Sequence, residues 1–351
     1  MGTHGHVSLQ ELDRFSRSAF LAIGADKDTA DAASRAMLHG TRFGVDSHGV
    51  RLLPHYIRAL EGGRLNKCPE IRKVGGFGAV EVLDADNAQG ALGAYRGMDR
   101  AIDLARQYGI GAVAIRNNSH FGPAGAYALA AAETGFIGLS FCNSDSFVRL
   151  HDGAMRFHGT NPISVAVPMG PENPWFLDMA TSAIPYNRVQ LYQSLGVQLP
   201  QAVASDSAGV DTTDPSAVDM LAPLGAEFGF KGAALAGVAE IFSAVLTGMR
   251  LSFDILPMGG PDFATPRALG AFVIAMNPDA FLDRASFDDG MRRYVEKLRT
   301  SPARENCRVM APGDREWEVA RQRQEQGVVL DPVTAEQFGA LAARLQIPPV
   351  A

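Results

Sequence analysis

Cysteine is scarce in this chain, and the cysteines that are present form no recognisable pair. Among 351 residues the three cysteines are Cys68, Cys142 and Cys307, which are widely spaced and form no CxxC motif. An odd number of separated thiols argues against a disulfide framework and against a zinc ribbon. The pattern predicts free, buried thiols in a reducing cytoplasm.

A long uninterrupted apolar run is also lacking. The longest candidate, GAALAGVAEIFSAVLTG at residues 232–248, contains Glu240 and falls short of the roughly 20 apolar residues that a membrane-spanning helix needs. The first residues, MGTHGHVSLQELDRF, contain no apolar segment of the secretory type. We therefore expect a cytoplasmic protein that does not enter a membrane.

An excess of positive charge and the common metal motifs are missing too. The net charge of −6 argues against an extended surface for nucleic acid. No HExxH motif is present, so we expect no catalytic metal. A metal hydrolase stays open as an alternative, and it would predict an activity that a chelator abolishes without any nicotinamide being present.

The usual glycine-rich phosphate motifs are lacking as well. No Walker A sequence occurs, although Gly109, Gly111 and Ala114 match the GxGxxA dinucleotide fingerprint. That fingerprint needs a strand before it and a helix after it, so that a pyrophosphate meets the helix N-terminus. Here a helical pattern precedes the glycines and a strand pattern follows them. We interpret them as a helix-to-strand turn.

Helical patterns occupy both ends of the chain, and strand patterns occupy its middle. Short, almost continuously apolar runs predict buried strands of a central sheet at residues 110–115, 136–142, 163–168, 175–180 and 271–276. Helices are expected at residues 12–24, after a capping box formed by Ser8 and Glu11, and at residues 28–40, 54–62, 90–109, 231–246, 286–300, 315–327 and 334–345. The sequence predicts an α/β fold in which both termini share one helical layer. The polar segment 204–222 is expected to be a surface excursion.

The stretch DSHGVRLLPHY, which begins at Asp46, concentrates polar side chains. It places Ser47, His48 and Arg51 just before Pro54, at an expected helix N-terminus. Backbone N–H groups there favour an anion and lower the pKa of a nearby histidine, which suits proton transfer near neutral pH. An equally open alternative is structural, with Ser47 capping the helix and His48 bonded in a turn.

A second polar stretch, NNSHFGPAGAY, begins at Asn117 and follows a predicted strand. Loops at strand ends commonly carry chemistry, and here His120 lies among amides and a hydroxyl. Gly122 and Gly125 allow a ligand to approach the backbone closely. A structural role for a single loop histidine remains the alternative interpretation.

Three further segments offer polar groups for a ligand. Thr160 and Asn161 lie in a GTNP turn, where they can bond sugar or phosphate oxygens or simply stabilise the turn. Asp178 stands in an otherwise apolar strand, so it requires a partner such as a histidine or ribose hydroxyls. Lys231 opens a helix, either as a phosphate contact or as a solvated lysine.

Five motifs occur in a specific order between residues 46 and 232: DSHG, NSHFGPAGAYA, GTNP, DMATS and FKG. Together they resemble the malate/L-lactate dehydrogenase family that is unrelated to the Rossmann lactate dehydrogenases. Its members include ureidoglycolate, sulfolactate and diketogulonate oxidoreductases and a Δ1-piperideine-2-carboxylate reductase. The C-terminal stretch APGDREWEVARQRQEQGVVL is similar to the family as well.

The resemblance implies an oxidoreductase that uses NAD or NADP, with a non-Rossmann cofactor domain around a central mixed sheet at residues 75–284. It also implies a discontinuous helical domain, residues 1–74 and 285–351, for substrate and dimer contacts. The protein is expected to form a homodimer with the partner subunit near the active site, and to bind a small molecule.

Motif matching to the family also implies a set of site residues. The catalytic group comprises His120 for proton transfer, His48 with Ser47 for orientation and polarisation, and Arg51. The cofactor groove is expected to be lined by His120, Gly122, Ser144, Asp145, Thr160, Asn161, Asp178, Thr181, Ser182 and Lys231.

Two departures from the family pattern bear on these assignments. The usual SHGVxRLPxY carries an arginine four residues after the histidine to grip the substrate carboxylate, whereas this chain has Leu52 there and Arg51 one residue earlier. A shift of one residue turns a helical side chain by about 100°. After the ATS sequence, Asn187 and Arg188 replace the usual residues, and the guanidinium of Arg188 suits the 2′-phosphate of NADP.

We expect reversible hydride transfer between C4 of nicotinamide and C2 of a small 2-oxo or 2-hydroxy acid, with one histidine as general acid and one as polarising donor. The alternatives are reduction of a cyclic imine such as Δ1-piperideine-2-carboxylate, and a non-catalytic nucleotide-binding homologue that has lost its chemistry.

Overall fold

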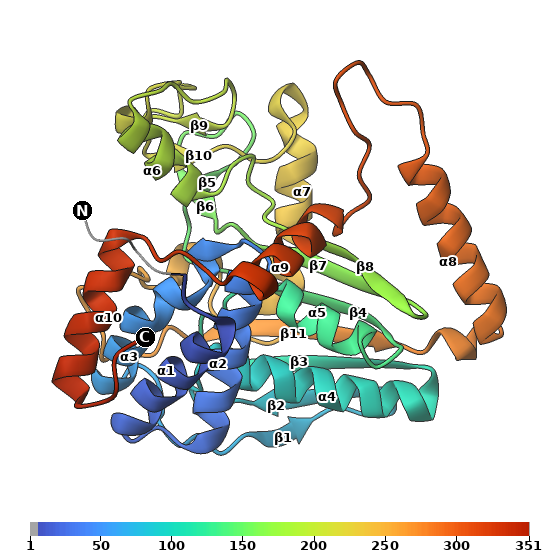
Figure 1. Cartoon of the computed structure of the whole chain (residues 1–351), viewed down its shortest axis with the longest axis horizontal. Coiled ribbons are helices and arrows are strands. Elements are labelled where there is room, and N and C mark those ends of the chain that lie inside the picture. The colour runs from blue at the N-terminus through green and yellow to red at the C-terminus, as the bar shows by residue number, and fades with distance from the viewer. Residues whose placement is uncertain (1–5, 351) are drawn as a thin grey trace.

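The centre of the molecule is a seven-stranded mixed sheet (Figure 1), seen in a computed structural model that describes residues 6–350. The strand order is β1-β2-β3-β11-β4-β7-β8, in which β2 and β3 run parallel and the other neighbours run antiparallel. The predicted α/β class with a central mixed sheet is confirmed. The bounds are β1 Arg72–Gly75, β2 Val80–Asp84, β3 Ile110–Asn118, β4 Ile137–Cys142, β7 Ile163–Met169, β8 Glu172–Met179 and β11 Leu269–Met276.

The inner strands read as continuously apolar because both faces of the sheet are covered. On β3, Val113 and Ile115 pack against helices α4 (Gly90–Tyr108) and α5 (Gly125–Ala132). The alternate residue Ala114 packs on the opposite face with Ala239, at the end of α7 (Gly229–Glu240). Successive side chains of a strand point to opposite faces, so neither face of β3 needs polar residues.

Both ends of the chain build one helical layer, as predicted. Figure 1 shows the blue helices α1 to α3 beside the red helix α10, and their buried side chains form a common core. Val7 and Val328 pair in an isolated bridge, and Ser8 caps α1 by accepting from the N–H of Glu11 at 3.1 Å. The bounds are α1 Leu9–Ala22, α2 Lys27–Arg42, α3 Leu53–Glu61, α9 Asp314–Gln326 and α10 Pro332–Leu345.

Helix α8 (Arg284–Arg299) differs from the expected division at residue 285. In Figure 1 it lies far from α1 and α10, beside the hairpin of β7 and β8. Its buried Val295 packs with Met169 of β7 rather than with the terminal helices. Apart from Val295, the side chains of α8 are not buried. Its sequence therefore has no apolar pattern that would show whether the helix packs on the terminal helices or on β7.

A second, four-stranded sheet is the main feature that the sequence did not predict. Its order is β6-β5-β10-β9, and two of these strands come from the ends of the segment expected to be a surface excursion. Ala204 and Leu221 are fully buried there, together with Val189 of helix α6. Strands this short carry too little periodicity to be recognised. The bounds are β5 Val148–Arg149, β6 Arg156–His158, α6 Tyr186–Leu195, β9 Ala204–Ser205 and β10 Met220–Leu221.

The glycines of the GxGxxA match form the turn that was predicted. Gly109 ends α4 with a left-handed φ of 84°, and β3 begins at the next residue. Adding a Cβ to Gly111 would bring it within 2.1 Å of the Ala101 carbonyl, so this glycine allows the helix to lie close to the strand. The motif therefore serves helix-to-strand packing, not pyrophosphate binding at a helix N-terminus.

The apolar helix near residue 240 is tied into the sheet by a buried carboxylate. Among the described residues one helix, Ala226–Val245, is long and apolar enough to cross a membrane by length and composition alone. Its Glu240 is 7% exposed and accepts hydrogen bonds from Asn143 at 3.2 Å, Asn161 at 2.7 Å and the backbone N–H of Ser252 at 2.6 Å. These bonds join α7 to the loops after β4 and β6.

Replacing Glu240 with alanine is expected to lower the free energy of unfolding by about 3 kcal/mol, because it removes a buried carboxylate that accepts four hydrogen bonds. Urea unfolding monitored by tryptophan fluorescence measures the change. Glu227→Ala, at an exposed site just before the same helix, provides the control and should change stability by less than about 0.5 kcal/mol. A Glu240→Ala protein as stable as the control would contradict the role of the carboxylate.

Candidate active site

The DSHG segment is a short, firmly held connection between α2 and α3. It forms two 3₁₀ turns, Asp46–His48 and Val50–Leu52. From helix α9, Arg323 grips the Asp46 carboxylate with both Nη atoms, at 2.5 and 2.9 Å. A planar two-point contact of this kind fixes orientation as well as position. The C-terminal part of the chain therefore holds the segment that carries His48.

His48 and His120 meet although they come from motifs far apart in the sequence. Their ring centroids lie 5.5 Å apart with an interplanar angle of 25°. Ser47 Oγ lies 2.9 Å from Nδ1 of His48, and the Tyr56 hydroxyl lies 2.8 Å from Nδ1 of His120. With each Nδ1 bonded, the Nε2 atoms are the ones left for proton exchange with a ligand.

The surroundings keep both rings neutral at pH 7. Burial lowers the pKa of His48 to about 4. Burial also lowers the pKa of His120 well below its usual value, and the charges of His48, Arg267 and His55 lower it further. Burial raises the pKa of the Tyr56 hydroxyl, so this group stays protonated and can donate or accept at His120. A negatively charged ligand bound beside the pair would raise these pKa values and favour protonation of a ring.

A groove of about 560 Å³ runs beside His48, which lines it; His120, which was expected to line the groove, lies behind His48 and is not part of the lining. Asp178 lines the groove, accepts a hydrogen bond from the backbone N–H of Gly125 at 3.0 Å and has its pKa raised by burial to about 6. A Cβ on Gly125 would lie 2.7 Å from this carboxylate, so the close approach requires glycine. Eight of the expected site residues line the groove: Ser47, His48, Arg51, Gly122, Thr160, Asp178, Ser182 and Arg188.

Two more of the expected residues lie behind the groove wall. Asn161 and Thr181 are buried, and their side chains are occupied within the protein. The Thr181 hydroxyl donates to the Thr160 carbonyl at 3.0 Å, and Asn161 adopts a positive φ of 34° while bonded to Glu240. Ser144 Oγ accepts from the Thr160 N–H at 3.2 Å. These residues hold Thr160 in place as part of the wall.

Two expected residues, Asp145 and Lys231, lie outside the groove, and Arg51 at its rim is bonded to another partner. Asp145 pairs with Arg267, a residue that the motifs did not indicate. Lys231 is exposed beside the ring of Phe228, 5.3 Å away, and does not line the groove. The half-exposed Arg51 reaches Asp331 at 3.5 Å, at the rim of the groove. The shifted position of this arginine thus directs its guanidinium toward the C-terminal helix.

The groove fits a nicotinamide nucleotide by the chemistry of its lining. Thr160 and Ser182 offer hydroxyls and Asp178 a carboxylate, which are partners for ribose and amide groups. Gly122 has a positive φ of 76° and carries no side chain, so a ligand can approach the backbone next to His120 closely. Arg188 adds an exposed guanidinium that suits a phosphate group. Within residues 6–350 no cluster of three or more potential metal ligands is found.

A comparison with known proteins places this site in a family. Residues 7–338 match the family model described as malate/L-lactate dehydrogenase. The chain belongs to the malate/L-lactate dehydrogenase family. This confirms the resemblance stated from the five motifs, and it makes the chain an oxidoreductase.

Relatives in this family cover nearly the whole chain. Hydroxycarboxylate dehydrogenase B from Escherichia coli K12 is 32% identical over 334 residues, covering 93% of this chain and 91% of the relative. A (2R)-3-sulfolactate dehydrogenase (NADP⁺) from Chromohalobacter salexigens is 32% identical over 321 residues, covering 91% and 93%. Among solved structures, malate dehydrogenase from Entamoeba histolytica superposes with a TM-score of 0.92 at 28% identity, covering 99% of each chain.

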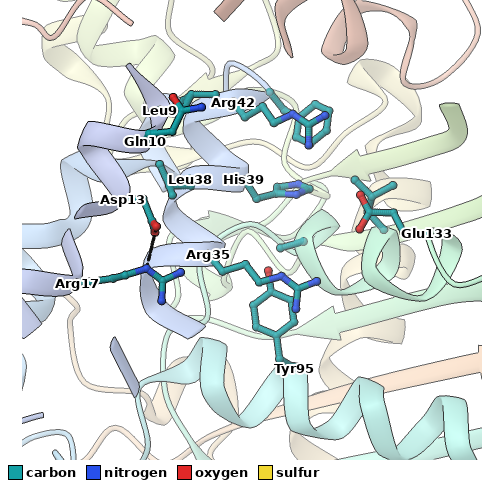
Figure 2. A pocket seen from close by; sticks show the side chains of 13 residues that line it. Leu9, Gln10, Asp13, Arg17, Arg35, Leu38, His39, Arg42, Tyr95 and Glu133 are labelled. Carbon is teal, nitrogen blue, oxygen red and sulfur yellow. Dashed lines mark hydrogen bonds and ion pairs between the residues drawn. The ribbon is translucent and has the colours of Figure 1, made fainter. Parts of the chain in front are cut away.

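A second pocket of about 360 Å³ in this dehydrogenase lies behind His39 and Phe43, which line both it and the groove. Figure 2 shows Arg35 beside the Tyr95 ring, at 4.1 Å, and Arg17 directed toward Asp13. None of the five family motifs contributes a residue to this pocket except Ala126. The groove beside the histidine pair is therefore the candidate active site.

Residues that the motifs missed complete the site of this family member. Tyr56 lies in the quoted stretch DSHGVRLLPHY, so its place in the sequence was a signal, although its bond to His120 was not predictable. Arg267 and Arg323 lie outside all five motifs, and tertiary packing alone brings them to the site. No spacing rule in the sequence connects either arginine to its acidic partner.

Proposed function

We propose that this protein transfers hydride reversibly between a nicotinamide nucleotide and C2 of a small 2-oxo or 2-hydroxy acid. The observation that carries the proposal is the contact of His48 with His120 beside a groove lined by hydroxyls, a carboxylate and an arginine. Relatives named as hydroxycarboxylate and malate dehydrogenases support the class of substrate.

The residues of this chain handle the proton and the orientation of the substrate. A bound reduced nicotinamide would supply the hydride. His120 delivers a proton from Nε2 to the substrate oxygen during reduction and takes it back during oxidation. The Tyr56 hydroxyl, 2.8 Å from Nδ1, holds the ring in place. It donates to Nδ1 when the ring is neutral and can accept from Nδ1–H when the ring is protonated. His48, steadied by Ser47, polarises the carbonyl as a hydrogen-bond donor.

The lowered pKa of His120 is consistent with this role. Burial and neighbouring positive charges keep the ring neutral in the free enzyme. A substrate carboxylate placed nearby would oppose those charges and raise the pKa, because an opposite charge favours the protonated form. The proton needed for reduction would then be loaded when the anionic substrate binds.

A substrate panel tests the proposal. Pyruvate, oxaloacetate, a larger aryl 2-oxo acid and Δ1-piperideine-2-carboxylate are supplied with NADH or NADPH, and absorbance of the reduced nicotinamide is followed. Reduction of at least one 2-oxo acid, with oxidation of the matching 2-hydroxy acid, is expected. Activity on the imine alone would overturn the hydroxy-acid proposal, and no turnover on any member would support a non-catalytic homologue.

The imine reductase is kept as a second candidate because of one observation. The structure of a Δ1-piperideine-2-carboxylate reductase from Pseudomonas syringae superposes with a TM-score of 0.83 at 27% identity, covering 96% of this chain and 99% of that one. In that reaction His120 would protonate the ring nitrogen instead of an oxygen. The same panel distinguishes the two candidates.

We further propose that Arg188 selects NADP through the 2′-phosphate. Its exposed guanidinium lines the groove, and one relative is named as NADP⁺-dependent. Arg188→Ala is expected to raise the KM for NADPH about tenfold and to leave the KM for NADH within about twofold, because one charged hydrogen bond is lost. Arg293→Ala, which removes an exposed charge on α8, is the control. Equal changes for both nucleotides would contradict the assignment.

A homodimer in the cytoplasm completes the proposal. An exposed apolar stripe on α7 and the π-helical turn Ile241–Val245 supports an interface, since monomers rarely expose such a patch. Val238 is 39% exposed, Ile241 53% and Val245 60%. Light scattering of the purified enzyme should give twice the monomer mass, and a monomer mass would contradict the interface.

A further inference from the structure

The sheet topology brings the charged residues Asp145 and Arg267 to the end of the sheet where His120 also lies. On β3, Asn118 pairs with Leu269 of β11, and on β11 Ala271 pairs with Cys142 of β4. His120 follows the end of β3, Asp145 follows the end of β4, and Arg267 precedes the start of β11. All three therefore emerge at the same edge.

Arg267 is a buried guanidinium with one nitrogen unused. The residue is 3% exposed; its Nε donates to the Leu256 carbonyl at 2.8 Å, and its Nη2 pairs with the Asp145 carboxylate. Among residues 6–350, Nη1 is buried and has no hydrogen-bond partner. An unpaired buried donor on a charged group carries a substantial desolvation cost, so a ligand oxygen at this atom would be favourable.

The charge around Arg267 is net positive. Arg64, 2% exposed, lies close enough for its pKa to be lowered by burial and then by Arg267, and its Nε is also unpaired among the described residues. Two carboxylates oppose this positive charge. Asp145 is already paired with Arg267, and the exposed Asp262 raises the pKa of Arg64 by its negative charge. His55 also faces this cluster, together with Arg58 from its own helix.

The competing arginine is directed elsewhere. Arg51 is half exposed and pairs with Asp331 at 3.5 Å, and Leu52 packs against the apolar core of the helical layer. Neither side chain supplies a buried cation beside His120. The strand register, by contrast, places Arg267 at the same end of the sheet as His120. Its positive charge also lowers the pKa of His55 and of His120, after the larger effect of burial.

We propose that Arg267 binds the carboxylate of the substrate through its free Nη1 and thereby determines selectivity for 2-oxo acids over neutral carbonyl compounds. This inference rests on the proposed function. Asp145 positions the guanidinium, and the carboxylate bound there opposes the positive charge that keeps His120 neutral. The residue that recognises the acid group thus also favours loading of the catalytic proton.

The test compares a 2-oxo acid with its neutral amide, pyruvate with pyruvamide, or the corresponding pair for the best acid of the panel. The ratio of kcat/KM for acid over amide is measured for the wild type, Arg267→Gln and Arg267→Lys. We expect the ratio to fall at least tenfold in Arg267→Gln, mainly through KM for the acid, because a charge-assisted bond is lost. Arg267→Lys should lie between, because a lysine keeps the charge but not the planar geometry.

Arg149→Gln is the matched control, because Arg149 is also buried and paired with an aspartate, Asp211, in the small sheet. It should leave the acid-to-amide ratio within about twofold. If Arg267→Gln does not fold, as judged by loss of NAD(P)H binding, a ratio at least threefold lower in Arg267→Lys supports the proposal and an unchanged ratio overturns it. A folded Arg267→Gln with the wild-type ratio overturns it as well.

The two proposals fail in different ways. A wild type that reduces no 2-oxo acid removes the proposed function, whatever the variants do. A wild type that reduces the acid, with variants that keep its preference over the amide, removes the role of Arg267 alone.

Discussion

Replacing His120 with alanine is expected to lower kcat by about 10²-fold or more while NAD(P)H still binds, because general acid–base catalysis contributes on this scale. The ring is hydrogen-bonded through Nδ1 to Tyr56 and stacked on His48. It belongs to none of the apolar core clusters. Its loss therefore removes a proton carrier without removing the groove. Steady-state assays at saturating substrate give kcat, and stopped-flow measurement gives the rate of the hydride step itself.

Two controls separate chemistry from folding in this experiment. Binding of NADH, followed by nicotinamide fluorescence, should stay within about threefold of the wild type because Thr160, Asp178 and Ser182 are unchanged. His6→Ala, at an exposed histidine outside the site, should retain full turnover. A His120→Ala enzyme with near wild-type turnover would remove His120 from the mechanism.

Acid is expected to destabilise this protein strongly between pH 7.5 and about pH 5. Burial lowers the pKa of His39 to about 3 and the pKa values of His48 and His55 to about 4. The unfolded chain binds protons at an ordinary pKa near 6.5, so the stability that these neutral rings contribute is present above that pH and is lost as the pH falls. Each ring contributes a loss of about 2 kcal/mol at pH 5.

Asp178 acts in the opposite direction. Burial raises its pKa to about 6, so its contribution is present at low pH and is lost as the pH rises through that value. After this offset the net loss from pH 7.5 to pH 5 is expected to be on the order of 5 kcal/mol. Urea unfolding at a series of pH values measures it.

A histidine variant sharpens the acid prediction. His39 lies between the rings of Phe43 and Phe176, with centroids at 4.6 and 5.8 Å, so phenylalanine is a close replacement for it. His39→Phe should reduce the acid-induced loss of unfolding free energy by about 2 kcal/mol. Phenylalanine binds no proton in either state, so acid no longer favours the unfolded chain at this position. A stability that is flat from pH 7.5 to pH 5 in both proteins would show that these rings are protonated in the folded state.

The sequence predicted the large elements because each carried its own periodicity. The apolar runs form β3, β4, β7, β8 and β11, of which β3, β4 and β11 are covered on both faces, and Ser8 caps the start of α1. It did not predict the small sheet, whose strands are two or three residues long, or the location of α8, whose sequence is mostly polar. Such features depend on tertiary contacts, which leave little trace in a local pattern.

The same division applies to the site. Polar clusters in quoted motifs pointed to His48 and His120, and the structure stacks the two rings. The motifs could not show that Asn161 and Thr181 lie behind the wall, because a turn residue looks alike whether it bonds a ligand or its own backbone. Arg267 was missed because a lone arginine before a strand has no motif, and its significance comes from a buried, unpaired nitrogen.

We propose that the two imidazoles form one proton-transfer centre beside the bound coenzyme. A crystal structure of the enzyme with NAD(P)H and a non-reactive 2-oxo acid analogue tests this arrangement. We expect the nicotinamide ring at the groove end next to His48 and His120, with Nε2 of His120 within hydrogen-bonding distance of the analogue's oxygen. A coenzyme bound elsewhere, or the two rings on separate sides of the ligand pocket with neither near that oxygen, would contradict it.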